Sequence, residues 1–423
     1  MISIPRKKIR EYDAKKMLAA NLAKYGYDIS LEVAKVDEHT SFEALESEHS
    51  WLKTKKLVVK PDQLIGKKGK RNLVLLNASI DEAKKFIKGN MGKTVEIGSV
   101  SGVLTNFIIE PFVEHDNEYF LAIMSQREED IILFSEKGGV DVEEHWHKII
   151  QIPVPINENI ENISITTRLP VSGERKERIV SFIKALYKYY VDFGCTYIEM
   201  NPLAFDNQER VYPLGFVCEL DDCEHFKCEG KWNGLEFPQP FGRKLYPQEK
   251  FVAELDDKTG ASLKLTVLNP NGKIWLLVAG GGASVIYTDT VVDLGYGKEL
   301  GNYGEYSGDP NEEETYHYAK TVIGLATNGG QEDRTLLIGG GVANFTNVAN
   351  TFKGIIRALR ESKEHLQKMK IFVRRGGPNF EEGLKMMRAL GEEINVSIDV
   401  YGPETHMTKI VDLAIKQMNG SSS

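Results

Sequence analysis

Two glycine triplets and a pair of arginines follow three short apolar runs in the second half of the chain. Gly280–Gly282 follow Ile274–Val278, Gly339–Gly341 follow Leu336–Ile338, and Arg374 and Arg375 follow Ile371–Val373. Such runs predict buried parallel strands that lead into helices. Glycine allows a close backbone approach to a ligand, and the next helix offers unpaired N–H groups to an anion. The pattern predicts a carboxylate or phosphate site at the carboxyl edge of a parallel sheet, although glycines that only form tight turns would look the same.

A lysine-rich loop in the first half of the chain could hold phosphate groups. Lys60 ends the apolar run Lys56–Lys60, and the loop GKKGK that follows contains Lys68 and Gly69. Ammonium groups act as point charges on phosphate oxygens, and glycine lets such a loop close over them. The loop lacks the spacing of a Walker motif, so the alternative is an ordinary solvated run of charge.

The segment Asn106–Val113 has a carboxylate and a proline near its end. Glu110 and Pro111 interrupt an apolar run, and a second apolar hairpin begins near Glu118. We expect this passage to form a hinge between two lobes. Backbone groups of Pro111–Val113 would then face an adenine edge, and Glu110 or Glu118 would bind the ribose or the exocyclic amine.

Glu199 and Asn201 bring side-chain oxygens to the end of the predicted strand Tyr197–Met200. Mg²⁺ takes a few hard oxygen ligands and completes its shell with nucleotide phosphates and water. The pair is therefore a candidate Mg²⁺ site. The strand expected to lie beside it has Gly215 where a second carboxylate would help.

Asp256, Thr259 and the Ala261 carbonyl form a second candidate cation site within one short segment. A turn whose side chains cap their own backbone has the same composition, and it is the competing interpretation. Two hairpinned strands are expected directly after this turn.

Amphipathic helices are expected to position these groups. Residues 5–26 have a mostly one-sided apolar stripe and a basic outer face, and residues 173–194 predict a longer helix. Residues 230–249 are rich in proline, glycine and aromatics without periodicity, which predicts a domain boundary. A chain of 423 residues is longer than a single hydrophobic core usually supports, so we expect two or three domains.

Composition narrows the class of protein. The formal charge of -8 and the isoelectric point near 5.7 argue against a nucleic-acid or anionic-membrane partner. No apolar run approaches the length of a membrane span, and the first residues contain no hydrophobic signal core. Four cysteines are too few for a disulfide framework, so a cytoplasmic protein is expected.

The order of these motifs resembles a known family. REYDAKKML, VVKPDQLIGKKGK, FIIEPFV, GGVDVEE and YIEMNPL resemble the nucleotide-binding β subunit of the succinyl-CoA synthetase superfamily. KWNGLEFPQPFGR, VAGGGASVIYTDT, YGEYSGDP, GGGVANFTNVANTFKGIIRA and FVRRGGPN resemble, more specifically, the N-terminal part of ATP citrate lyase. The likeness covers essentially the whole chain, which is therefore similar to the short subunit of a two-subunit ATP citrate lyase.

The resemblance implies a multidomain α/β fold and a partner. A two-lobed ATP-grasp fold would occupy residues 1–111 and 112–242, and a flavodoxin-like citrate-binding domain residues 243–423. Citrate, ATP and CoA would be converted to acetyl-CoA, oxaloacetate, ADP and phosphate through a phosphohistidine, citryl phosphate and citryl-CoA. The resemblance assigns the phosphorylated histidine, the CoA site and the cleavage site to a partner subunit in a symmetric hetero-oligomer. No catalytic residue is therefore expected on this chain.

The family's binding positions fall largely on residues already singled out. Its ATP-binding positions correspond to Lys60, Lys68, Gly69, Pro111, Val113 and Glu118. Its citrate-binding positions correspond to Gly308, Asn344, Thr346 and Arg375, with Phe345 shaping the pocket. A tricarboxylate needs a bidentate guanidinium with amide and hydroxyl donors, and phosphoryl transfer needs lysines and Mg²⁺ to offset charge. The resemblance and the unaided interpretation therefore agree.

Two positions depart from the family pattern. The family commonly has arginine where Lys68 stands. Lysine lacks the planar guanidinium group that binds phosphate through two N–H groups, so weaker nucleotide binding is expected. The family usually has aspartate where Gly215 stands. Either Glu199, Glu219 or water replaces the missing carboxylate, or binding of the metal–nucleotide complex is impaired.

Three other functions would fit parts of this pattern. A subunit of a citryl-CoA synthetase would need the same chain, because cleavage lies in the partner. A succinyl-CoA synthetase β-type subunit would have no need for the added polar donors near Asn344–Thr346. A non-catalytic citrate or nucleotide sensor would account for the loss of the aspartate at Gly215.

Overall fold

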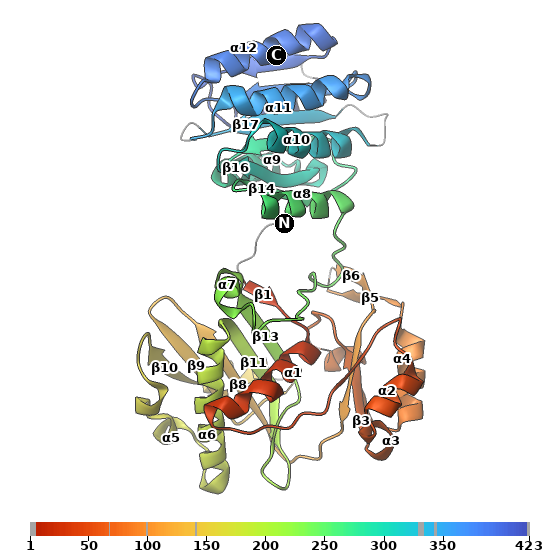
Figure 1. Ribbon diagram of the computed structural model, residues 1–423, viewed down its shortest axis with the longest axis vertical. Helices are drawn as coiled ribbons and strands as arrows, with labels where there is room; N and C mark the ends of the chain where they lie inside the picture. The colour runs from red at the N-terminus through yellow and green to blue at the C-terminus, as the bar shows by residue number, and fades with distance from the viewer. Residues whose placement is uncertain are drawn as a thin grey trace. The chain divides into compact units, whose positions relative to one another are not determined.

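The computed structural model describes residues 6–66, 68–98, 100–139, 142–328, 334–341 and 345–420. They form two compact units, one spanning Ile4–Lys244 and the other built from Leu245–Ser423. We call these the N-terminal unit and the C-terminal unit (Figure 1). Among the described residues, no helix is long and apolar enough to cross a membrane.

The strands of the N-terminal unit pair antiparallel in two main sheets. The larger sheet has the order β1 (Arg6–Lys8), β13 (Phe216–Asp221), β11 (Cys195–Phe205), β8 (Glu118–Ser125), β9 (Glu129–Ser135) and β10 (Ile150–Pro155), with β12 (Val211–Pro213) paired to β11. The smaller sheet has the order β2 (Ala34–Val36), β7 (Phe107–Pro111), β3 (Leu57–Pro61) and β4 (Leu75–Ala78), and β5 (Thr94–Ile97) pairs with β6 (Val100–Val103). Each sheet has its own apolar core.

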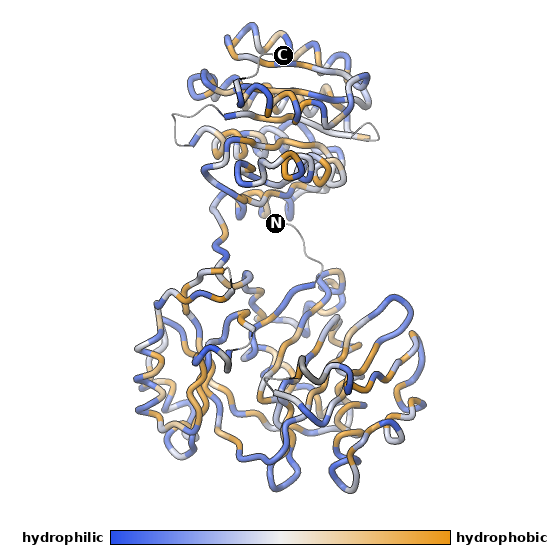
Figure 2. Tube along the Cα trace, turned by 180° about the vertical axis from the view of Figure 1, so that it is seen from behind, coloured by the Kyte–Doolittle hydropathy of each residue, from blue (hydrophilic) through white to orange (hydrophobic). Residues whose placement is uncertain are grey.

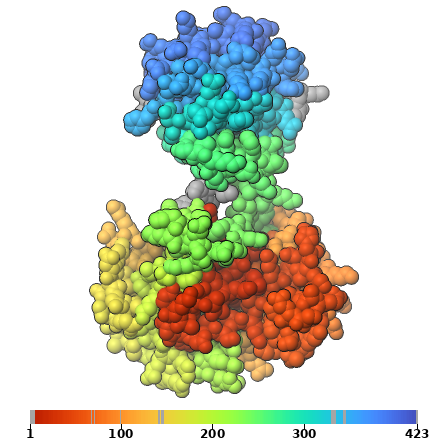
Figure 3. Space-filling model, viewed as in Figure 1, coloured from red at the N-terminus to blue at the C-terminus, as the bar shows by residue number. Residues whose placement is uncertain are grey.

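Helices cover these sheets where their apolar stripes match. They are α1 (Glu11–Asn21), α2 (Phe42–Glu48), α3 (Trp51–Thr54), α4 (Ile80–Asn90), α5 (Ile165–Arg168), α6 (Gly173–Asp192) and α7 (His225–Cys228). In α6, Ile179, Phe182, Ile183 and Leu186 recur at helical spacing and are fully buried in the core of the larger sheet. Figure 3 shows the red N-terminal segment, which includes α1, lying across one face of this unit.

The C-terminal unit is a mostly parallel sheet between two layers of helices. The strand order is β14 (Ser262–Val267), β16 (Asn302–Ser307), β15 (Ile274–Ala279), β17 (Thr335–Gly340), β18 (Lys370–Arg374) and β19 (Ile398–Tyr401), in which only the β14–β16 pair of these described strands is antiparallel. Every residue of β15 and β17 is buried, as expected for strands covered on both faces.

Two apolar cores flank this sheet. One core includes side chains of α8 (Pro247–Lys258), α10 (Glu312–Thr327), α11 (Val348–Glu361) and α12 (Phe380–Ile394). The other includes side chains of α9 (Gly281–Asp293) and α13 (Lys409–Met418). Figure 2 shows hydrophobic stretches interspersed with hydrophilic ones along the trace of both units. The parallel order β15–β17–β18 brings the ends of three predicted strands to one edge.

Three details differ from the expectations. Residues 5–26 are not one helix, because Arg6–Lys8 form β1 against β13 before α1 begins at Glu11. The strand with Glu199 does not end at Met200 but continues with a register shift to Phe205. The two strands after Ala261 are not a hairpin, because β16 inserts between β14 and β15. Local alternation predicted strands correctly but could not identify their non-local partners.

Candidate functional site

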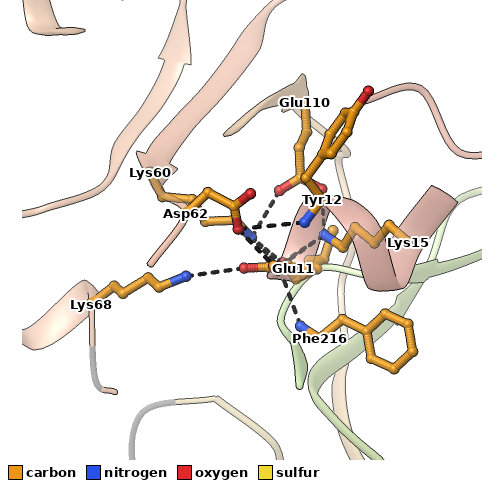
Figure 4. A network of polar contacts seen from close by, with 9 residues as sticks. Glu11, Tyr12, Lys15, Lys60, Asp62, Lys68, Glu110 and Phe216 are labelled. Atoms are coloured by element: carbon orange, nitrogen blue, oxygen red, sulfur yellow. Dashed lines mark hydrogen bonds and ion pairs between the residues drawn. The ribbon is translucent and has the colours of Figure 1, made fainter. Parts of the chain in front are cut away.

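Five charged side chains converge inside the N-terminal unit. We call Glu11, Lys15, Lys60, Lys68 and Glu110 the lysine–glutamate cluster (Figure 4). The Lys60 Nζ lies 2.7 Å from the Glu11 Oε1 and 2.8 Å from the Glu110 Oε1. The Lys68 Nζ lies 3.2 Å from the Glu11 Oε2. The structure therefore brings together three of the residues that the sequence assigned to a nucleotide.

The remaining member, Lys15, comes from α1. Its Nζ lies 3.0 Å from the Glu11 Oε1, pairs with the Glu110 Oε2 and donates to the Leu214 carbonyl at 3.3 Å. The helix that the sequence described as having a basic outer face thus turns one lysine inward, where it is 1% exposed. Neither Glu11 nor Lys15 was singled out as a binding residue. Their i, i+4 spacing on a predicted helix was the available signal.

Opposite charges are balanced around the cluster. Three ammonium groups face two carboxylates within it, and the buried Asp62 beside it, which interacts with Lys68, adds a third negative charge above its pKa of about 6. Burial alone would raise the pKa of Glu11, but Lys15, Lys60 and Lys68 hold it well below its usual value. Burial alone would lower the pKa of Lys60, but Glu11 and Glu110 raise it above its usual value. Glu11 and Lys60 are therefore both stabilised in their charged forms.

Asp62 anchors α1 beside this cluster. Its Oδ1 accepts the backbone N–H groups of Glu11 at 2.9 Å and Tyr12 at 3.4 Å, at the start of the helix. Burial raises the pKa of Asp62 to about 6, against the opposing effect of Lys68.

The predicted hinge residues lie next to the cluster. Glu110 and Pro111 end β7, and together with Val113 they line a cavity of about 1210 Å³ in the N-terminal unit. This volume is sufficient for a nucleotide. Gly69 begins a short 3₁₀ turn directly after Lys68. Glu118, the first residue of β8, is not a member of the cluster. Its Oε1 lies 3.3 Å from the His115 Nε2.

Glu199 and Asn201 occupy alternate positions on β11, so their side chains project from the same face. The Asn201 Oδ1 accepts the Gly139 N–H at 2.6 Å, and the Glu199 carboxylate accepts the Tyr197 hydroxyl. Both offer hard oxygens of the kind that Mg²⁺ prefers. Among the described residues, no three histidine, cysteine, aspartate or glutamate side chains are arranged to hold a metal ion.

Backbone packing explains the glycine at position 215. The Asn201 N–H donates to the Gly215 carbonyl at 3.0 Å, and a Cβ at Gly215 would lie 2.1 Å from the Asn201 carbonyl oxygen. A side chain there requires the backbone to shift.

The second candidate cation site is largely occupied by the chain's own donors. The Asp256 Oδ1 accepts the Leu263 N–H at 2.7 Å, and its Oδ2 pairs with Lys264. The Thr259 hydroxyl donates to the Ala261 carbonyl at 3.5 Å. These contacts are those of a capped helix end.

Two adjacent arginines of the C-terminal unit have opposite surroundings. Arg374 donates to the carbonyls of Thr405, Gly340 and Pro403 at 2.8, 3.1 and 3.2 Å. Arg375 is fully buried, and none of its three guanidinium nitrogens has a hydrogen-bond partner among the described residues. Burial lowers the pKa of Arg375 from its usual value. The Tyr306 hydroxyl is buried and equally unpartnered there.

A glycine makes room for the Arg375 side chain. A Cβ at Gly340, the last residue of β17, would lie 2.0 Å from the Arg375 Nη1. A buried cation is strongly unfavourable unless a counter-ion accompanies it. The surroundings of Arg375 therefore favour an anion next to its guanidinium.

The other predicted citrate residues are placed unevenly. Gly308 follows β16 with a positive φ of 73°, and Thr346 is buried. Phe345 is 98% exposed. Asn344 lies outside the described residues, so its predicted role stays a prediction.

Comparison with known proteins gives a consistent result over the whole chain. The ATP-citrate synthase ATP-grasp domain model matches residues 5–232, and the ATP citrate lyase citrate-binding model matches residues 243–417. ATP-citrate synthase alpha chain protein 2 of Oryza sativa subsp. japonica is 50% identical over 97% of this chain and 98% of its own length. Human ATP-citrate synthase is 47% identical over 90% of this chain, a match that spans 35% of the human protein.

A solved structure extends the match to three dimensions. ATP citrate lyase from Methanothrix soehngenii, in complex with citrate and coenzyme A, has a TM-score of 0.90 to this chain. It is 50% identical, and the match covers 97% of this chain and 100% of that chain. The predicted combination of an ATP-grasp fold with a citrate-binding α/β domain is confirmed. The chain belongs to the ATP-citrate synthase family, also called ATP citrate lyase.

Proposed function

We propose that this chain is the ATP- and citrate-binding subunit of an ATP citrate lyase. With a partner subunit it would convert citrate, ATP and CoA to acetyl-CoA, oxaloacetate, ADP and phosphate. The observation that supports this most is the buried Arg375 guanidinium, which lacks a partner among the described residues. Such a group fits one carboxylate of a small polyanion.

The nucleotide would bind in the N-terminal unit. Lys60 and Lys68 would bind phosphate oxygens, because their ammonium groups lie close together and act as point charges on such oxygens. Gly69 would let the loop approach the phosphates, and Pro111 and Val113 would offer backbone groups to the adenine. Glu110 and Glu118 complete the proposed nucleotide-binding set.

Mg²⁺ would bind beside the phosphates. Glu199 and Asn201 are the proposed ligands, since they offer two hard oxygens on one face of β11. The ion would supply charge neutralisation for the moving phosphoryl group. Asp256, Thr259 and the Ala261 carbonyl remain a second and weaker proposal, because Lys264 already neutralises the Asp256 carboxylate.

Citrate would bind at the carboxyl edge of the parallel sheet. Arg375 would pair with one carboxylate, and Asn344 and Thr346 would donate to the others. The N-terminus of α11 and the Gly308 backbone would add N–H groups, and Phe345 would shape the entrance.

A partner subunit would complete the reaction. The match spans only 35% of the human protein, and the phosphorylated histidine, CoA site and cleavage site would lie in a second subunit of a symmetric hetero-oligomer. The expected location is the cytoplasm. Residues 1–111 and 112–242 would be the two lobes of the ATP-grasp fold, and residues 243–423 the citrate-binding domain.

Calorimetric titration of the chain tests the citrate assignment. Citrate and succinate are titrated separately, with and without Mg-ADP, into the wild type and into Arg375→Ala. Citrate binding that the substitution abolishes, without succinate binding, supports the proposal. Succinate binding would overturn it. If neither ligand binds, the same titration on the complex co-expressed with the partner shows whether the partner completes the site.

A non-catalytic sensor is the second candidate, because Gly215 replaces the family's usual aspartate and leaves no room for a side chain. Mg-ATP-dependent phosphorylation of the partner's histidine separates the two hypotheses, since a sensor would bind ligands without supporting the transfer. Detection of acetyl-CoA separates a lyase complex from a citryl-CoA synthetase.

A further inference from the structure

Lys15 and Lys60 contact the same three acceptors. Both ammonium groups reach the Glu11 carboxylate, the Glu110 carboxylate and the Leu214 carbonyl. They arrive from different elements, Lys15 from α1 and Lys60 from β3. In Figure 4 the two side chains approach Glu11 and Glu110 from different directions. One lysine therefore duplicates the contacts of the other.

The position of Lys15 is held by both main sheets of the N-terminal unit. Asp62, which follows β3, accepts two N–H groups at the start of α1. Glu11 accepts the Phe216 N–H of β13 at 3.2 Å, while its carboxylate also pairs with Lys60 of the smaller sheet. Helix α1 is thus fixed at its first turn, and Lys15 has little freedom to leave the cluster.

The ion pairs that Lys60 makes with Glu11 and Glu110 compete with its binding to a phosphate. If Lys60 turned toward a nucleotide with no other cation present, Glu11 and Glu110 would be left as neighbouring buried carboxylates. Breaking a buried pair in this way is strongly unfavourable. A second ammonium group on the same acceptors removes that penalty, because the carboxylates stay neutralised.

We propose that Lys15 is a positioning residue of the nucleotide site, whose ammonium group keeps Glu11 and Glu110 neutralised when Lys60 turns to a nucleotide phosphate. This inference rests on the proposed role of Lys60 in nucleotide binding. Lys15 itself has no contact with the nucleotide in this scheme, and no covalent step is involved.

The chain offers a matched control in the next residue. Lys16 is exposed, and its Nζ lies 5.4 Å from the centre of the Tyr12 ring rather than in the cluster. Lys15→Met and Lys16→Met remove the same charge from the same helix. Only the first substitution should affect the nucleotide site.

Mg-ADP is titrated calorimetrically into the wild-type chain, Lys15→Met, Lys15→Arg and Lys16→Met. We expect Lys15→Met to raise the Kd at least about tenfold, because Lys60 is then the one ammonium group of the cluster that still pairs with Glu110. Lys15→Arg should recover part of the affinity, and Lys16→Met should bind as the wild type does. Citrate titration of Lys15→Met should be unchanged, because Arg375 lies in the C-terminal unit, and a circular dichroism spectrum like that of the wild type shows that the N-terminal unit is folded. Wild-type affinity in Lys15→Met would overturn the proposal.

A double variant separates charge balance from packing. Lys15→Met combined with Glu11→Gln removes one charge of each sign, so Mg-ADP affinity should return to within about threefold of the wild type. If it does not return, Lys15 has a packing role and the proposal is wrong. If Lys15→Met alone does not fold, the double variant gives the answer, and failure of both to fold makes the pair a folding element and overturns the proposal. Unchanged Mg-ADP binding in Lys60→Met would instead overturn the proposed nucleotide site.

Discussion

The two units of this chain contain buried cations in opposite electrostatic states. In the N-terminal unit, Lys60 is surrounded by acceptors of its own chain, with two carboxylates within 2.8 Å. In the C-terminal unit, Arg375 has no partner among the described residues for any guanidinium nitrogen. The Lys60 site is therefore stabilised by the chain's own carboxylates, whereas the Arg375 guanidinium would be paired only by an added anion.

The same contrast occurs between neighbours in the sequence. The Arg374 guanidinium donates to three backbone carbonyls, and these hydrogen bonds stabilise the fold. Arg375 is equally buried, but its guanidinium has no hydrogen-bond partner among the described residues. Because a buried unpaired charge opposes folding, Arg375 is better suited to binding a ligand than to stabilising the fold.

The largest expected effect is on stability. Lys15→Met combined with Lys60→Met should lower the free energy of unfolding by about 3–5 kcal/mol, because it removes both ammonium groups that pair with the largely buried Glu110 carboxylate. Arg375→Met should leave that free energy unchanged or raise it, since it removes a buried charge that has no partner among the described residues. Urea denaturation of both variants measures the difference. Equal destabilisation of the two variants would show that Arg375 is paired in solution, and the contrast would fail.

The second prediction uses the pH dependence of the cluster. Asp62 has a pKa of about 6, compared with an ordinary value of 3.8. Its protonated form is therefore favoured in the folded chain, so stability falls as pH rises from about 4 to about 6. The shift of about two units corresponds to about 3 kcal/mol.

Asp62→Asn keeps an oxygen that can accept the N–H groups of α1 but cannot ionise. Unfolding of the wild type and this variant is compared at several pH values between 4 and 7. The wild type should lose stability relative to the variant as pH rises through this range. Parallel curves would mean that Asp62 titrates normally.

The third prediction concerns the missing carboxylate. Gly215→Asp should destabilise the N-terminal unit by about 1–3 kcal/mol, because the new Cβ meets the Asn201 carbonyl. It should not tighten Mg-ADP binding. Gly230→Asp is the control, since nothing lies within 4 Å of a Cβ at Gly230. A stable Gly215→Asp variant with higher Mg-ADP affinity would contradict the packing argument.

The smallest expected effect tests whether Arg375 contacts citrate. Gly340→Ala places a methyl group where the Arg375 Nη1 lies, so the flexible guanidinium must move. We expect about tenfold weaker citrate binding, equivalent to about 1.4 kcal/mol, with little change in stability. Gly341→Ala, which meets nothing within 4 Å, should bind normally. Equal affinities in the two variants would place citrate away from Arg375.

Much of the architecture was predictable because its signals are local. The apolar runs before Gly280 and Gly339 identified buried parallel strands, and the stripe of α6 identified its helix. The motif order was enough to predict the family. By contrast, insertion of β16 between β14 and β15 could not be predicted, because strand pairing depends on partners distant in sequence.

The candidate site residues were also only partly predictable from the sequence. The residue types that could bind phosphate and carboxylate were evident from the sequence, since Lys60, Lys68 and Arg375 lie at strand ends and glycine-rich turns, and the family resemblance selected Arg375. The different surroundings of Arg374 and Arg375, and the inward direction of Lys15 beside the exposed Lys16, came from the tertiary structure. The physical reason is that a charge acquires its role from its partners and its burial, and both come from segments far apart in the chain.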